Sequence, residues 1–91
     1  MVQLDEELRE ELSDEIHEIW IGWMEFLFGW CSEQPDGSMV IPAQRVEHWR
    51  RQMRTRYAEL SEGEKDEDRD QVDRLKMVVQ DYLERRGGRG R

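Results

Sequence analysis

The residues that could do chemistry in this 91-residue chain are two histidines, one cysteine and a set of arginines. His17 is followed four positions later by Ile21, so the chain lacks the second histidine of a His-Glu-x-x-His zinc motif. Cys31 is the single cysteine, which excludes an intramolecular disulfide framework and a multi-cysteine zinc site. The acidic clusters lie on an expected exposed helix, where carboxylates lack the raised pKa that acid catalysis requires. We therefore expect no catalytic residue, no metal, no cofactor and no enzyme activity.

Arginines gather on one face of a helix expected from Pro42 to Leu60. They are Arg45, Arg50, Arg51, Arg54 and Arg56. As a functional stripe they could contact phosphates on a nucleic acid or on a nucleotide. Alternatively they pair with the acidic runs at 5–18 and 62–70, because the chain has 22 acidic residues against 14 basic ones. Some of them could do both.

Four tryptophans are a high aromatic content for so small a domain, and we expect most of them to be structural. They are Trp20, Trp23, Trp30 and Trp49. A tryptophan at the rim of a pocket can stack on a base, which contributes about 1–3 kcal/mol. It can equally be the central residue of a protein interface.

Apolar residues three and four positions apart predict a first helix over residues 4–30. Its acidic start, residues 1–15, is expected to be an extension of the domain body, and acidic residues there suit the helix dipole. From Ile16 onward the segment is apolar nearly all round, which predicts that this half is buried.

Pro35-Asp-Gly37 indicates a turn inside an irregular loop, and Met39 to Ile41 is expected to be extended. Ser61-Glu-Gly-Glu64 is a capping box that predicts the start of a third helix reaching about Arg86. A flexible Gly/Arg tail is expected at 87–91. The expected fold is mainly α: a compact three-helix domain with one irregular loop and at most a short extended segment.

The overall charge limits the partners of the chain. A net charge of −8 and a pI near 4.7 exclude a general polyanion binder, because a negative surface repels phosphate backbones. No apolar run reaches the roughly 20 residues that span a bilayer, and the acidic start differs from the basic start of a signal peptide. We expect a soluble, cytoplasmic domain without a membrane partner.

Two motifs carry a resemblance to a known family: Ile16-His-Glu-Ile-Trp20 and Leu60-Ser-Glu-Gly-Glu-Lys-Asp-Glu-Asp-Arg69. Together they resemble the ryanodine receptor (RyR) repeat domain, found also in many prokaryotic and phage proteins. The string from Trp49 to Tyr57 is most similar to small phage and prophage proteins of this type. The likeness covers about residues 16–80 of an expected domain at 16–86. It departs from the receptor repeats after Trp30, where a compact acidic loop replaces a longer one containing proline and arginine, so a pocket wall formed by that loop would be altered.

The resemblance implies a non-enzymatic recognition module that binds an adenine nucleotide or a nucleotide-derived ligand. Carried over, it nominates Trp20 to stack on the base, with His17 one turn earlier as an orienting group. Arg69 matches the arginine of the second motif, although an ion pair with an acidic residue of the first helix is its expected role. The proposed site also includes Trp49, with Arg50, Arg54 or Arg69 neutralising phosphate. A phage could use such a module to sequester a host defence signal, which would place it in the host cytoplasm.

Two alternatives stay open. The acidic helix at 4–18 could pack on a copy of itself or on a host protein, which would make the chain an interaction or homo-oligomeric assembly module. The arginines of the second helix could instead contact DNA, although the net charge opposes this.

Overall fold

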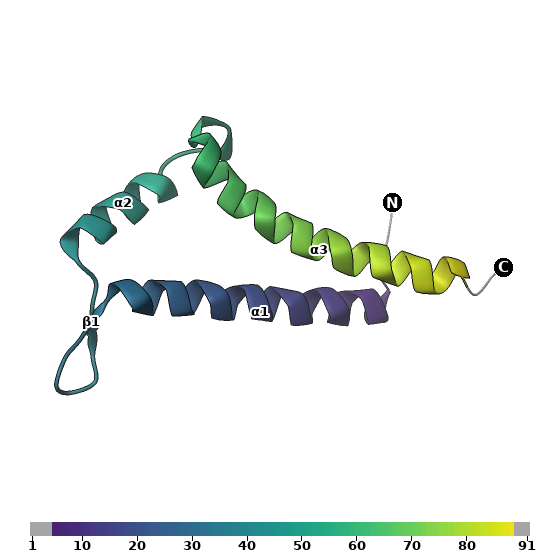
Figure 1. Ribbon diagram of the computed structural model, residues 1–91, viewed down its shortest axis with the longest axis horizontal. Coiled ribbons are helices and arrows are strands. Elements are labelled where there is room, and N and C mark those ends of the chain that lie inside the picture. Colours follow the sequence, from purple (N-terminus) through teal and green to yellow (C-terminus); the bar gives the residue numbers. More distant parts are fainter. Residues whose placement is uncertain (1–4, 89–91) are drawn as a thin grey trace.

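The computed structural model describes residues 5–88 as three helices joined by a small hairpin and a short 3-10 turn (Figure 1). The elements in chain order are α1 (Glu6–Trp30), β1 (Ser32–Glu33), β2 (Met39–Val40), α2 (Ala43–Met53), η1 (Tyr57–Glu59) and α3 (Glu62–Gly88). The prediction of a mainly α domain with three helices and one loop is confirmed. Within the described residues, every helix is too short or too polar to cross a membrane. The acidic extension and the basic tail fall partly on 1–4 and 89–91, which lie outside the described residues.

Side-chain caps begin the two long helices. The Asp5 carboxylate accepts a hydrogen bond from the Leu8 backbone N–H at 2.9 Å and so caps α1. At α3 the Glu64 N–H donates to Ser61 Oγ, while the Ser61 N–H donates back to the Glu64 carboxylate, both at 3.2 Å. The predicted capping box is confirmed.

The loop after α1 is a two-stranded antiparallel hairpin in which Ser32 lies opposite Val40. Its turn is held by Asp36, whose carboxylate accepts from the Ser38 N–H at 2.9 Å and from Ser38 Oγ at 2.6 Å. Gly37 has φ of +88°, a left-handed conformation that glycine adopts without a Cβ penalty. The predicted turn and extended segment are both present.

Helix α2 ends at Met53, so the prediction of a continuous helix to Leu60 is wrong. The Arg54 N–H is shared among the carbonyls of the preceding turn, and Thr55 Oγ1 donates to the Arg51 carbonyl at 2.6 Å. These local bonds complete the last turn, and Arg56 then takes an extended conformation before η1.

Among the described helices, the most extensive contact is the one between α1 and α3, which run antiparallel (Figure 1). The most buried side chains are Leu8 and Ile19 of α1 and Tyr82 of α3. Ion pairs flank this apolar contact: Glu15 bonds to Arg74 at 2.7 Å. The first half of α1, expected to extend beyond the domain body, is packed along the second half of α3.

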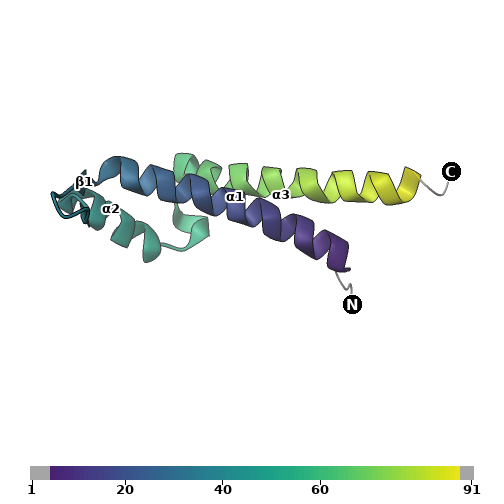
Figure 2. The same ribbon diagram turned by 90° about the horizontal axis from the view of Figure 1, so that it is seen from below.

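The second half of α1 is not the buried segment that its composition predicts. Of residues 16–30 only Ile19 is buried, and the other large side chains stay intermediate or exposed. The physical reason is coverage: α3 packs against one side of α1, and α2 reaches only its C-terminal end (Figure 2). The second half of α1 is apolar nearly all round, but too few other elements pack against it to bury all of its sides.

The three helices enclose an open triangle, with α1 and α3 diverging toward the end that α2 spans (Figure 1). The radius of gyration is 18.1 Å, whereas a globular chain of this length has about 12 Å. The accessible surface is 7708 Å², about 2,000 Å² more than a folded monomer of 11.1 kDa usually exposes. The chain therefore exposes more surface than a compact monomer of this mass, and large apolar side chains supply part of it.

Candidate functional site

Exposed apolar side chains are the dominant chemical feature of the surface. Among the described residues, those that are large, hydrophobic and at least 39% exposed are Ile16, Trp20, Trp23, Phe26, Phe28, Trp30, Val40, Ile41, Met53, Tyr57, Val72, Met77 and Leu83. Soluble monomers rarely expose contiguous apolar patches beyond a few hundred Å². Exposed apolar side chains in this number make the surface of α1, α2 and α3 the candidate binding site.

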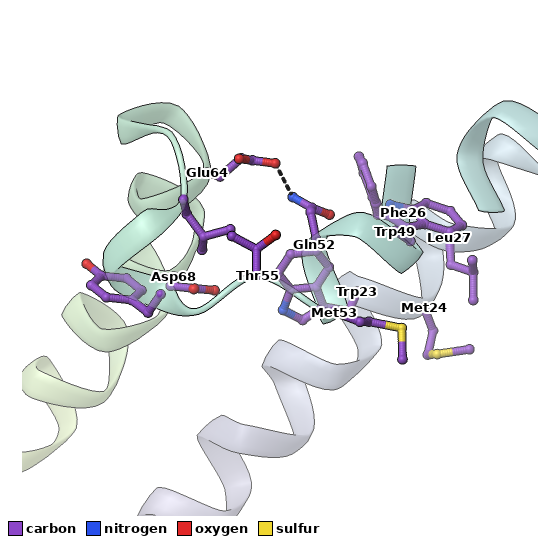
Figure 3. A pocket seen from close by; sticks show the side chains of 12 residues that line it. Trp23, Met24, Phe26, Leu27, Trp49, Gln52, Met53, Thr55, Glu64 and Asp68 are labelled. Carbon is purple, nitrogen blue, oxygen red and sulfur yellow. Dashed lines mark hydrogen bonds between the residues drawn. The ribbon is translucent and has the colours of Figure 1, made fainter. Parts of the chain in front are cut away.

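One part of this surface is hollowed into a groove of about 490 Å³ between α1, α2 and the start of α3, which we call the aromatic groove (Figure 3). Its lining residues are Trp23, Met24, Phe26, Leu27, Trp49, Gln52, Met53, Thr55, Tyr57, Leu60, Glu64 and Asp68. Each of the three helices contributes, so the groove exists because α2 bridges the diverging ends of α1 and α3.

Aromatic contacts hold α2 against the end of α1. The Phe26 ring lies 6.5 Å from Trp49 and 6.4 Å from Trp30, centroid to centroid. The Arg45 guanidinium lies 3.3 Å above the Trp30 ring, a cation–π contact. The Phe26–Trp30 pair is edge-on and the Phe26–Trp49 pair is tilted, so side-chain packing fastens α2 to the end of α1 beside the groove.

The polar edge of the groove is centred on Glu64. Its carboxylate accepts from Arg51 Nη2 at 2.6 Å and from Gln52 Nε2 at 2.9 Å, the second of which is drawn in Figure 3. The hydrogen bond from Arg51, with further bonds from Ser61, lowers the pKa of Glu64 from 4.5 to about 2. Asp68 also lines the groove. Of the two charged residues that line the groove, Glu64 is neutralised by Arg51 and Asp68 is acidic, so the lining offers no cation to a phosphate.

The structure places Trp20 and His17 on α1, outside the aromatic groove. Their rings stack with centroids 5.7 Å apart and planes 19° from parallel, and Trp20 is 54% exposed. Trp20 therefore faces solvent rather than the core. Trp49 was also predicted to bind the ligand; it is half-buried and lines the aromatic groove.

Arg50 and Arg54 lie on a different side of α2, beside a shallow hollow formed with Val40 and Pro42. Within residues 5–88 no carboxylate oxygen lies within 4 Å of either guanidinium, whereas Arg51 pairs with Glu64 at 2.6 Å. The expectation that these arginines pair with acidic residues is therefore met for Arg51 and not for its two neighbours. Phosphate contact by Arg50 and Arg54 stays a prediction.

Arg69 is engaged by its own helix and by η1. It donates to Asp66 at 2.9 Å, to Glu62 at 3.0 Å and to Tyr57 Oη at 3.0 Å. These bonds raise the pKa of Arg69 further above its already high value. An ion pair was expected with an acidic residue of the first helix. That expectation is wrong, because residues on neighbouring turns of α3 are closer to Arg69. The predicted ligand residues thus fall in four places: Trp20 with His17, Trp49 in the groove, Arg50 with Arg54, and Arg69.

Several residues of the aromatic groove were not predicted as site residues, notably Trp23, Met53 and Tyr57. Met53 and Tyr57 share the three-and-four spacing of Val46 and Trp49, yet Met53 is 84% exposed. Periodicity identifies which face of a helix is apolar but does not say whether another element covers it.

Among the described residues, no three His, Cys, Asp or Glu side chains are grouped closely enough to hold a metal ion. The Cys31 thiol is half-buried and donates to the Leu27 carbonyl at 3.2 Å. Comparison of the chain with protein-family models, curated proteins and solved structures finds no match. The resemblance to the RyR repeat stays a prediction.

Proposed function

We propose that this protein is an interaction module that binds another protein chain through its exposed apolar surface. One observation carries the proposal: the chain exposes about 2,000 Å² more accessible surface than a typical monomer of this mass. Exposed tryptophan and other large apolar side chains supply part of this surface, and tryptophan is enriched among residues that dominate binding at protein interfaces.

The chemistry of the aromatic groove favours a protein over a nucleotide. Its walls are apolar, Glu64 is already paired with Arg51, and Asp68 is acidic, so a phosphate would find no cationic residue in the lining. Arg69, the arginine that the resemblance assigns to the second motif, already forms ion pairs with Glu62 and Asp66. An apolar helix or loop of a protein partner would meet neither obstacle.

Photo-crosslinking tests this proposal. Benzoylphenylalanine replaces either Trp20 or Met77 in cells that produce the chain; both side chains are more than half exposed, on different helices. A crosslinked protein product from position 20, absent from position 77, supports the interaction module. If position 20 yields no more protein product than position 77, the proposal fails.

A second candidate, a nucleotide-binding module, is favoured by one observation: Trp20 is an exposed indole with the His17 ring stacked beside it. Tryptophan fluorescence and melting temperature, measured against mono-, di- and cyclic nucleotides, test it. A ligand at a hundred times its dissociation constant adds about 2.7 kcal/mol to stability. Stabilisation by one class of nucleotide, lost in Trp20→Ala with the fold retained, would support it; no response to any nucleotide would refute it. A phage origin and a cytoplasmic location belong to this candidate as predictions.

A further inference from the structure

We infer that the partner is a second copy of this chain, packed on one apolar face of the α1/α3 pair to form a four-helix core. This inference rests on the proposed function and adds the identity of the occupant. It depends on which side of each helix is apolar, on the antiparallel direction of the pair, and on the area left uncovered.

Helix α1 carries two apolar lines, not one. The first contains Leu8, Leu12 and Ile19 and faces α3. The second contains Ile16 and Trp20, lies one residue further along the chain and is therefore turned by about 100° around the helix axis. Ile16 and Trp20 are each more than half exposed, so the second line has no partner within the described residues.

Helix α3 repeats the arrangement. Leu75, Val78 and Tyr82 form the line that faces α1. The line one residue further along contains Val72, Val79 and Leu83, of which Val72 and Leu83 are each 58% exposed.

The antiparallel direction brings the two unpartnered lines to the same side. On each helix, the step from the contact line to the line one residue later is a rotation of about 100° around the helix axis. Seen from one end of the pair, this rotation is clockwise on one helix and counterclockwise on the other, because the helices are antiparallel. Both second lines consequently lie on one side of the pair. The Glu15–Arg74 ion pair sets Ile16 level with the middle of α3. We call the surface formed by Ile16, Trp20, Val72, Val79 and Leu83 the apolar face.

The opposite side of the pair is mostly charged. Turning about 100° the other way from each contact line reaches Glu7, Asp14, Glu18 and Glu25 on α1 and Arg74, Met77 and Asp81 on α3. Met77 is the one large apolar side chain among these residues, so the apolar face is the more apolar of the two sides. Lys76 stands between Val72 and Val79, and a single lysine in such a line can fix the register of a helical assembly.

The uncovered area agrees with a homodimer. A standard interface buries about 800 Å² per partner, and obligate homodimers bury about 2,000–5,000 Å² in total. The excess of about 2,000 Å² is spread over the whole chain, and burying less than half of it at the apolar face would reach the size of a standard interface. A two-fold contact needs a self-complementary surface, and a two-helix face packed on an identical face makes the core of a four-helix bundle. The chain thus supplies its own complement.

Sedimentation equilibrium of the full chain with two matched variants tests the inference. Leu83→Glu puts a charge on the apolar face. Met77→Glu makes the same kind of change about 120° away on α3, at a residue that is also more than half exposed. We expect wild type and Met77→Glu at twice the chain mass of 11.1 kDa. Leu83→Glu should associate roughly 100-fold more weakly, because its carboxylate would be buried unpaired. Val72→Glu replaces Leu83→Glu if the latter loses its helical circular dichroism signal.

Two results overturn the second-copy inference: a monomeric wild type at every concentration, or equal dimerisation of Leu83→Glu and Met77→Glu. A monomer that still gives a heavier crosslink from position 20 overturns the inference and leaves the interaction module standing. A monomer without any such crosslink overturns both.

Discussion

Arg85 Nη2 lies 2.6 Å and 2.7 Å from the two carboxylate oxygens of Glu11, which joins the first half of α1 to the end of α3. Asp5, the N-cap of α1, is bonded in turn by Arg86 and by the Tyr82 hydroxyl. The acidic start of α1 is thus held by basic residues at the end of α3. This arrangement keeps the two helices aligned along their apolar contact.

Replacing Arg85 by Gln should lower the melting temperature, because Glu11 loses its cationic partner. The loss should shrink as salt rises to about 1 M, since exposed ion pairs are screened. Thermal unfolding followed by circular dichroism at low and high salt measures both effects. Arg9→Gln is the control, because the Arg9–Glu6 pair lies within one turn of α1 and joins no other element. Equal losses for the two variants would refute the role of Arg85.

Ile19→Ala should reduce the free energy of unfolding by about 2–4 kcal/mol, because it empties a buried position between α1 and α3. Ile16→Ala, three residues away on the apolar face, is the comparison. In the Leu83→Glu background, where that face is uncovered, it should change stability by less than about 1 kcal/mol. Denaturant titration measures both variants. A small loss for Ile19→Ala would show that α1 and α3 do not pack as described.

The Glu64 carboxylate should make stability depend on pH. Its pKa is lowered from 4.5 to about 2 in the folded chain, chiefly by the hydrogen bond from Arg51. The folded state therefore holds the charged form more tightly than the unfolded state does. This stabilisation is complete above pH 4.5 and is lost as the pH falls toward about 2. The difference in melting temperature between wild type and Glu64→Gln should accordingly narrow across this range; a constant difference would contradict the assignment.

Gly37→Ala should destabilise the hairpin by about 1 kcal/mol, because alanine strains at the left-handed φ of +88°. A Cβ at this position would meet no atom within 4 Å, so the cost belongs to the backbone alone. Gly22→Ala is a matched control: its Cβ is equally unobstructed, but it lies inside α1, where alanine favours the helix. Opposite signs of the two changes in unfolding free energy are expected, and equal signs would contradict this account.

Local features of this fold could be predicted because they depend on near neighbours in the chain. The capping box of Ser61 and Glu64 and the turn at Asp36 each involve residues within a few positions of one another. The end of α2 at Met53 was missed because Thr55 bonds back to Arg51 without a glycine or proline to mark the break. The exposure of the second half of α1 was missed for a different reason, since it depends on how few elements surround this helix.

The separation of the candidate ligand residues could not be predicted either. Helical spacing placed His17 beside Trp20, and the two rings do stack. It could not show that Arg69 would be engaged by Glu62, or that Trp49 would lie in a groove that excludes Trp20. These facts depend on the angles between helices, which no local pattern records.

The most direct measurement of the central claim is acrylamide quenching of tryptophan fluorescence in wild type, Leu83→Glu and Met77→Glu. If another copy covers the apolar face, Trp20 is shielded in wild type and Met77→Glu and becomes accessible in Leu83→Glu. Dilution of wild type below the dimer dissociation constant should raise its quenching to the Leu83→Glu value. Identical, concentration-independent quenching in all three proteins would contradict the claim that this face is covered by a second chain.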